Sequence, residues 1–429
     1  MITGNAAVHR TVEAVWRMES TKIIGGLARF LRDVGLAEEL AQDALVAALE
    51  QWPRDGVPDN PGAWLMQSAK HRAIDLVRRR TLHQRKEGEL AFEIEQQLAD
   101  AAPDLMATID KLFDDPLGDD TLRLVFIACH PVLATESRVA LTLRMVGGLT
   151  TDEIARAFLT RESAIAQRIV RAKRTLGEAR VPFELPPVAE LSARVASVLE
   201  VLYLVFNEGY SATAGDDWVR PALCEDALRL GRILAQRMPD DPEVLGLVAL
   251  MEIQASRLRA RVDSAGEPIL LLDQDRSKWD QLLIRRGLAA LERAQALASA
   301  QDGLGPYGLQ AAIAACHARA RTAGATDWQR IAALYDALAQ LSPSPVVELN
   351  RAVAVAMAFG PAAGLDLVDG LRAEPRLASY HLLPSVRGDL LNKLGRHDEA
   401  GREFERAAGL TRNARERGLL LARAAACKH

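Results

Sequence analysis

The apolar positions of the first 80 residues recur at helical spacing and predict three helices. The first spans roughly Thr11 to Val34, and Gly35 is expected to end it. The second spans about Ala37 to Gln51 and should stop at Pro53. The third is expected from Pro61 to about Arg80, because an Asn-Pro pair suits the N-cap and first helical positions. Together they predict a small helical domain.

A second helical segment, from about Thr121 to Gly177, contains a helix-turn-helix pattern. The residues Asp152 to Phe158 form its first predicted helix, and Thr160 is expected to cap the second. One stripe of the second helix is apolar and should be buried. It consists of Ile165, Ile169, Ala172 and Leu176. A basic stripe on the opposite face would suit a helix that lies in a DNA major groove.

From about Val188 onward, predicted helices alternate with glycines at a weak internal period. The surroundings of Gly395 resemble the second helix of a tetratricopeptide repeat (TPR), which predicts stacked helix pairs. One irregular stretch, Val262 to Asp280, is expected to form a small hairpin or an ordered loop.

Length and composition support an all-α protein of several domains. The chain has 429 residues, 49% of them hydrophobic and only 5% aromatic, and it exceeds what one core usually organises. The four cysteines form no C-x-x-C pair, so the sequence indicates neither a zinc site nor a disulfide framework. We find no secretion signal and no apolar run of about 18 residues. A cytoplasmic protein without membrane association or cofactor is therefore expected.

Charge is segregated along the chain in the order basic, acidic, basic. The segment 70–86 is strongly basic, 87–120 carries eleven acids against one lysine, and 138–180 is basic again. The acidic stretch has few sustained apolar positions, so residues 83–120 are predicted to form a linker.

Three motifs, in this order, resemble the extracytoplasmic-function (ECF) sigma factors, which belong to the sigma-70 family of RNA polymerase sigma factors. The segment Ala37 to Leu45 is similar to their region 2.2, Ala63 to Arg80 to region 2.4, and Glu153 to Leu176 to region 4.2. Two positions depart from the family pattern: His71 stands where Asn is common, and Leu159 where Gly is common. The resemblance implies a non-enzymatic protein that directs core RNA polymerase to promoters for transcription initiation.

The resemblance also implies roles for individual residues. The implied partner is core polymerase, with its β′ and β subunits. An acidic helix carrying Glu39, Gln42, Asp43 and Leu45 would dock on a basic coiled coil of the β′ subunit. Recognition of the −10 promoter element would involve Asp59, Asn60, His71, Arg72, Arg78 and Arg79. Recognition of the −35 element would involve Ala164, Gln167, Arg168, Arg171, Lys173 and Arg174.

Simpler interpretations stand beside these. The acidic helix could be an ordinary solvated face, and the basic stripe an ordinary amphipathic surface helix. The side chains of Trp52 and Trp64 are expected to pack in the core instead of stacking on bases.

The resemblance divides the chain into four segments: region 2 at 1–82, the linker at 83–120, region 4 at 121–180 and a TPR-like repeat domain at 188–429. The repeat domain resembles the extension of one subgroup of the family, which lacks a membrane anti-sigma partner. We therefore expect the repeats to contact the sigma domains of the same chain and to regulate them.

Two other protein classes compete with this interpretation. A helix-turn-helix regulator with a ligand-sensing or protein-sensing repeat domain would leave the first two motifs unexplained. An enzyme would need paired carboxylates, for which the candidates are Glu208, Asp273, Asp275 and Asp280, but no nucleophile, metal cluster or phosphate loop accompanies them. The polar clusters around Tyr210 and Trp279 suit either a binding site or hydrogen bonding between repeats.

Overall fold

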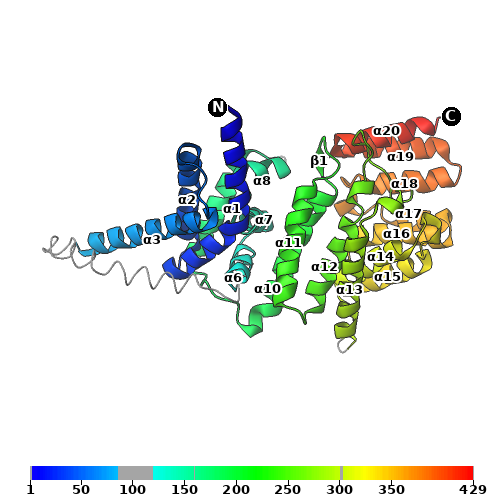
Figure 1. Cartoon of the computed structure of the whole chain (residues 1–429). Coiled ribbons are helices and arrows are strands. Elements are labelled where there is room, and N and C mark those ends of the chain that lie inside the picture. Colours follow the sequence, from blue (N-terminus) through cyan, green and yellow to red (C-terminus); the bar gives the residue numbers. More distant parts are fainter. Residues whose placement is uncertain (1, 86–118, 159, 300–302, 429) are drawn as a thin grey trace. The chain divides into compact units, whose positions relative to one another are not determined.

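The computed structural model describes residues 2–85, 119–158, 160–299 and 303–428. The chain divides into two compact units, one of residues 1–156 and 160–201, the other of 157–159 and 202–429. Both are built from helices (Figure 1), so the all-α prediction is confirmed. Most of the predicted acidic linker, 86–118, lies outside the described residues.

The first three helices pack on one another, as the sequence predicted. They are α1 (Ile2–Leu31), α2 (Val34–Asp55) and α3 (Pro61–Arg85), drawn in blue in Figure 1. Their shared core consists mainly of Trp16, Ile23, Leu27, Ala44, Trp52, Leu65 and Ala69. Burial of these apolar side chains is the main favourable contribution to this packing.

Two predicted helix ends are wrong, for local reasons. Gly35 lies inside the first turn of α2, because Asp33 acts as the N-cap and accepts from the Leu36 amide at 3.0 Å. Pro53 lies inside α2 as well. It lies in the last turn, so the helix continues for only two residues beyond it, and Gly56, which has a φ of 88°, follows as the C-cap.

The helix-turn-helix follows in the same unit. Helices α6 (Asp119–Ala128) and α7 (Thr135–Met145) precede it, and α8 (Thr151–Ala157) and α9 (Glu162–Glu178) form it. The four residues of the predicted apolar stripe of α9 are all buried. Thr160, however, does not cap α9, because the N-cap position falls to Arg161, which makes no side-chain cap. A reciprocal capping box between Thr150 and Glu153 begins α8 instead.

Helix α10 (Val188–Tyr210) contributes to both units, because the division falls after Val201. Its first half is fixed to α6 and α7 of the first unit. Arg194 donates to the Phe126 carbonyl at 2.7 Å, and Ser197 donates to the Cys129 carbonyl at 2.5 Å. These bonds satisfy carbonyl groups at the C-terminal end of α6, which lack helical partners.

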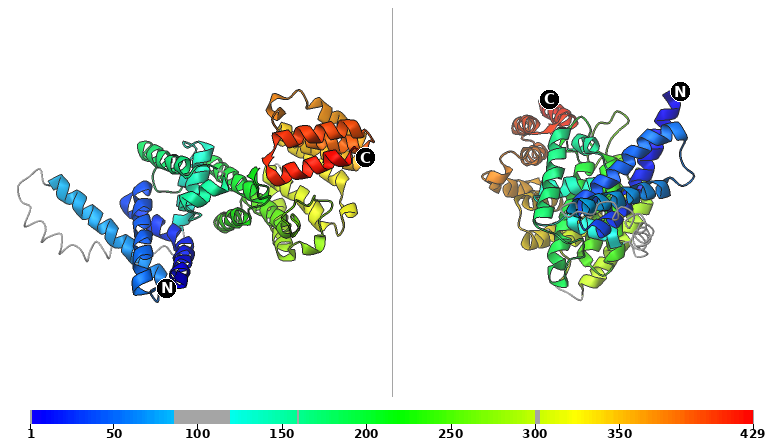
Figure 2. Two further views of the ribbon diagram at one scale, coloured as in Figure 1. Left: turned by 90° about the horizontal axis from the view of Figure 1, so that it is seen from above. Right: turned by 90° about the vertical axis from the view of Figure 1, so that its left-hand side faces the viewer.

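In the second unit, helices that follow one another along the chain lie side by side (Figures 1 and 2). The α-helices are α11 (Pro221–Arg237), α12 (Pro242–Ala255), α13 (Gln281–Ala298), α14 (Pro306–Arg319), α15 (Trp328–Leu341), α16 (Pro345–Phe359), α17 (Pro361–Gly370), α18 (Leu382–Lys393), α19 (His397–Leu410) and α20 (Ala414–Ala426). The short 3-10 helices are η1 (Leu258–Ala260), η2 (Arg276–Lys278), η3 (Ala323–Ala325) and η4 (Pro375–Leu377). Tight turns at Gly360 and Gly395, both with positive φ, allow neighbouring helices to reverse direction.

The beginning and the end of this unit are joined. Strand β1 (Ala214–Gly215) pairs in parallel with β2 (Arg412–Asn413). The buried Asn413 amide donates to the carbonyl groups of Ala212, at 3.1 Å, and Asp217, at 2.8 Å. In the stretch predicted as a hairpin or ordered loop, Val262 and Pro268 form an isolated antiparallel bridge.

Candidate polymerase and promoter-binding surfaces

The predicted polymerase contact lies along one face of α2. Glu39 and Asp43 are exposed, while Gln42 and Leu45 are half-buried between them and the core. Val46 adds an exposed apolar side chain beside this acidic face. The face thus offers two carboxylates next to apolar surface, a combination that suits a basic partner.

The loop between α2 and α3 carries the first part of the predicted −10 site. Asp59 and Asn60 are both exposed, but the Asn60 Oδ1 atom accepts from the Ala63 amide at 3.1 Å and caps α3. Trp52 is buried and meets Trp64 edge to face, with ring centroids 5.5 Å apart. The indole of Trp52 therefore belongs to the core, as predicted.

Helix α3 carries the rest of the predicted −10 site. His71 and Arg79 are exposed, and Arg72 and Arg78 are partly buried. Arg78 lies 3.9 Å from Asp75, one turn earlier in the same helix. The three arginines lie along the surface of a single helix, an arrangement that suits contact with a phosphate backbone.

The face of α9 opposite its buried stripe is accessible. Gln167, Arg171 and Arg174 are exposed, while Ala164 and Arg168 are partly so. Arg174 is held by Glu178, with Nε and Oε1 2.6 Å apart. The remaining member of the predicted −35 set, Lys173, does not lie on this exposed face.

Val170 was not among the residues predicted from the sequence, yet it is 63% exposed, between Gln167 and Arg171. An apolar residue in this position suits contact with a thymine methyl group in the major groove. Its position on the basic stripe, away from the apolar stripe, was the available signal.

Lys173 pairs with Glu38 of α2, so the two predicted binding surfaces meet through these residues. The carboxylate of Glu38 is buried and also accepts from Arg144 Nε of α7, at 3.0 Å. One carboxylate thereby compensates two partly buried cations. No sequence pattern indicates this contact, because Glu38 looks like the other acids of its helix.

A second contact between the same two groups of helices forms around Asp120. Its carboxylate pairs with Arg29 of α1 and with Arg123, the latter at 2.8 Å. Helix α6 comes so close to α1 that a Cβ atom on Gly25 would lie 2.6 Å from Asp120 Cβ. In addition, Thr21 donates to the Val146 carbonyl at 3.2 Å. Polar and steric features thus fix α1–α3 against α6–α9.

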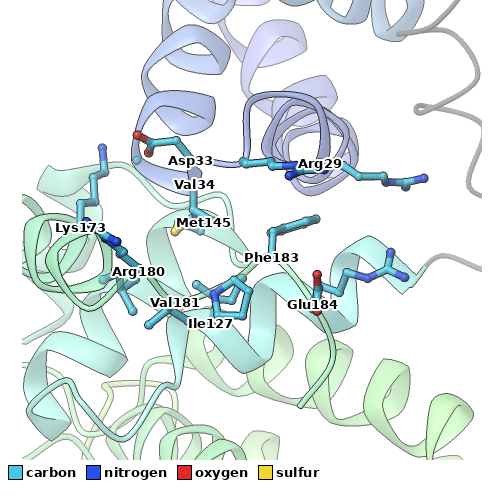
Figure 3. A pocket seen from close by; sticks show the side chains of 16 residues that line it. Arg29, Asp33, Val34, Ile127, Met145, Lys173, Arg180, Val181, Phe183 and Glu184 are labelled. Carbon is cyan, nitrogen blue, oxygen red and sulfur yellow. The ribbon is translucent and has the colours of Figure 1, made fainter. Parts of the chain in front are cut away.

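A cavity of about 700 Å³ remains between these helices (Figure 3). Five cationic residues line it: Arg29, Arg32, Arg123, Lys173 and Arg180. Arg29, Arg123 and Lys173 already have carboxylate partners, so the cavity is less positive than its cationic lining suggests.

Comparison with known proteins identifies the N-terminal half. Residues 16–82 match Sigma-70 region 2, 123–176 match Sigma-70 region 4, and 194–295 match a family of unknown function, DUF6596. The chain is 44% identical over 393 residues to an uncharacterized protein of Rhizobium meliloti, covering 92% of this chain and 90% of that one. It is 31% identical over 160 residues to the ECF RNA polymerase sigma factor SigK of Mycobacterium ulcerans, covering 36% and 78% respectively.

Two sigma-70 regions in this order, with an exposed recognition helix in the second, define a sigma-70-type initiation factor. The chain belongs to the ECF RNA polymerase sigma factors and carries a helical C-terminal extension. It is a sigma factor for transcription initiation that binds core RNA polymerase and promoter DNA. The alternative of a helix-turn-helix regulator is not favoured, and sigma factor families are not enzymes.

The described part of the chain contains no helix long and apolar enough to cross a membrane. Within the same residues, no group of three or more His, Cys, Asp or Glu side chains is arranged to hold a metal ion. The four cysteines are free and buried, and burial raises the pKa of Cys129 and Cys224 to about 12.

Proposed function

We propose that α2 docks on a basic coiled coil of the polymerase β′ subunit through Glu39, Gln42, Asp43 and Leu45. Two exposed carboxylates beside exposed apolar surface support this role. The same proposal assigns residues 1–82 to region 2 and residues 83–120 to a connector that threads the positively lined RNA path of the polymerase. The protein would act in the cytoplasm, where core polymerase is found.

The promoter is read at two places in this proposal. The loop with Asp59 and Asn60, followed by His71, Arg72, Arg78 and Arg79 of α3, would contact the −10 element. Helix α9 would contact the −35 element through Ala164, Gln167, Arg168, Arg171, Lys173 and Arg174. The observation that supports it best is the exposed stripe on α9, opposite its four buried apolar residues.

The contact between Glu38 and Lys173 implies that the sigma domains must separate on a promoter. Elements centred about 25 base pairs apart lie on the order of 85 Å apart on straight duplex at 3.4 Å per base pair. Helices joined by an ion pair cannot reach both elements at once. We therefore take the described arrangement to be a resting state, in which Lys173 is engaged by Glu38 instead of DNA phosphate.

The C-terminal domain, residues 188–429, would regulate the sigma domains of its own chain. A tethered domain acts at high effective concentration, so weak docking suffices. A stack of helices also offers the extended surface that such docking needs.

Run-off transcription with purified core polymerase tests this function. The full-length chain should give a promoter-dependent transcript, and the Arg168→Ala, Arg171→Ala double variant should lose it while remaining folded. An equal yield from the double variant would contradict the assigned −35 surface.

Truncation tests the regulatory role, and the structure indicates where to cut. A chain ending at Arg180 loses the α10 residues that bond to the α6 end, whereas one ending at Val201 keeps them. With the Val201 ending, higher transcription would indicate an inhibitory extension, and lower transcription a supporting one. Unchanged core binding, promoter binding and transcription would show that the extension has no regulatory role.

A further inference from the structure

Three arginines gather around two aromatic rings in the second unit, near η1 and η2. The guanidinium carbon of Arg261 lies 3.7 Å from the centroid of the Tyr210 ring. Arg257 lies 5.7 Å from the centroids of both Tyr210 and Trp279. Arg276 lies 4.9 Å from the Trp279 centroid. Aromatic faces attract cations, but they do not neutralise them.

This arginine cluster lacks compensating negative charge. Arg257 is only 6% exposed, and its side chain has no hydrogen-bond or ion-pair partner among the described residues. Arg261 interacts with the Tyr210 side chain, and burial lowers the pKa of its guanidinium. Arg276 donates to the carbonyl groups of His317 and Ala320, each at 2.7 Å. An isolated buried charge is costly, and proteins normally pair it.

The neighbouring His317 responds to the same positive field. Its ring is 7% exposed, and burial together with the charges of Arg257 and Arg276 lowers its pKa to about 3. It therefore stays neutral at physiological pH, which leaves the arginines as the only cations of the cluster.

Polar atoms without partners are concentrated in this cluster. Buried nitrogen atoms of five residues have none: Nε of Arg257, Arg261 and Arg276, Nε1 of Trp279 and Nδ1 of His317. Such atoms are rare in folded proteins, since each costs the desolvation of a polar group. Four of these five atoms carry hydrogens in every protonation state, so the cluster is rich in unused donors.

We propose that this arginine cluster of the C-terminal unit binds a small oxyanion, a molecule bearing carboxylate or phosphate groups. Arg257 is its principal ligand, because its buried guanidinium has no other acceptor. Guanidinium groups bind carboxylate and phosphate oxygens with strong, charge-assisted hydrogen bonds. Tyr210 and Trp279 hold the guanidinium planes in place, and Trp279 Nε1 supplies a further donor.

Isothermal titration of the full-length chain tests the proposal, with inorganic phosphate in one arm and citrate in the other. At least one probe should bind saturably at a single site, and the arm that responds identifies the anion chemistry. In Arg257→Gln the Kd should weaken by about tenfold or more, as expected for the loss of a charge-assisted hydrogen bond. Binding is measured without polymerase, so the result is independent of any regulatory role.

Arg259→Gln is the matched control, because Arg259 is exposed and lies two residues further along the chain. It should bind the probe like the unchanged protein. Arg257→Lys keeps the charge but loses the planar guanidinium, and it too should weaken binding. This variant tests the proposal if Arg257→Gln does not fold. Three results would overturn the proposal. The first is an equal loss of binding affinity in the Arg259 control, the second is a heat signal that sodium chloride reproduces at equal ionic strength, and the third is no binding of either probe.

Discussion

Lys173, on the recognition helix α9, donates to the buried carboxylate of Glu38, on the helix proposed to contact polymerase. A cation of the proposed −35 set and an acid of the helix proposed to dock on polymerase thus neutralise each other. Arg144 shares the same carboxylate, so the contact depends on a single acid.

Glu38→Gln should loosen the packing of α2 on α7 and α9. The change leaves Arg144 and Lys173 without a carboxylate, and breaking a buried pair costs about 3–5 kcal/mol. Amide hydrogen exchange should speed up in α2 and α9. Glu39→Gln is the control, since Glu39 is exposed on the same helix. Identical exchange in the two variants would mean that the ion pair does not hold these helices together.

Charge reversal on α2 should weaken binding to core polymerase. Replacing Glu39 and Asp43 together by Lys would place cations opposite the basic partner surface. The fold should survive, because both side chains are exposed. A pull-down with core polymerase measures the effect. The matched control reverses Glu50 and Asp55, two exposed acids further along the same helix. Equal retention of polymerase by both double variants would count against the assigned face.

Variants of α9 should separate base reading from phosphate contact. If Arg171 contacts a base, Arg171→Ala should cost about 1–3 kcal/mol of promoter binding and relax selectivity at one position. If it contacts a phosphate, all sequences should be bound more weakly and the salt slope should fall by about one. Arg161→Ala, before the helix, serves as the control. Binding curves unchanged in both selectivity and salt dependence would show that this face does not touch DNA.

The second unit should lose stability in mild acid because of His317. Its folded pKa is about 3, below the ordinary histidine value of 6.5, so the unfolded chain binds more protons between these values. The free energy of unfolding should therefore rise with pH across this window, and fall as pH drops from 6.5 toward 3. At full effect one group contributes about 1.4 kcal/mol per pH unit.

Urea denaturation at several pH values measures this dependence. His317→Gln should flatten it, whereas His397→Gln, at an exposed position of the same unit, should leave it unchanged. A slope that survives in His317→Gln would assign the acid sensitivity to other groups.

Local periodicity predicted the helices and the buried stripe of α9, because the residues of a helix alone determine which of its faces is apolar. The same periodicity could not predict which distant residues pack against that face. The partners of Glu38 lie more than 100 residues away, and the close approach at Gly25 depends on a helix that begins at Asp119.

The helix ends show a related limit. Gly35 and Pro53 are common helix breakers, but the Asp33 cap and the position of Pro53 near the end of α2 outweighed that tendency.

In the sequence, the arginine cluster was visible only as separate polar segments around Tyr210 and Trp279. Its lack of negative charge becomes apparent once Arg257, between them in the sequence, is seen to lie near both rings.

The bonds from Asn413 to Ala212 and Asp217 affect how the second unit can unfold. In an open array of repeats, each repeat contacts only its neighbours, and the outermost can melt alone. Here Asn413, the N-cap of the last helix, is hydrogen-bonded to the segment that follows α10. The first and last parts of the array therefore contact each other directly. Removing Asn413 together with α20 should therefore weaken the beginning of the unit as well, and the unit should unfold as one cooperative block instead of fraying from its C-terminus.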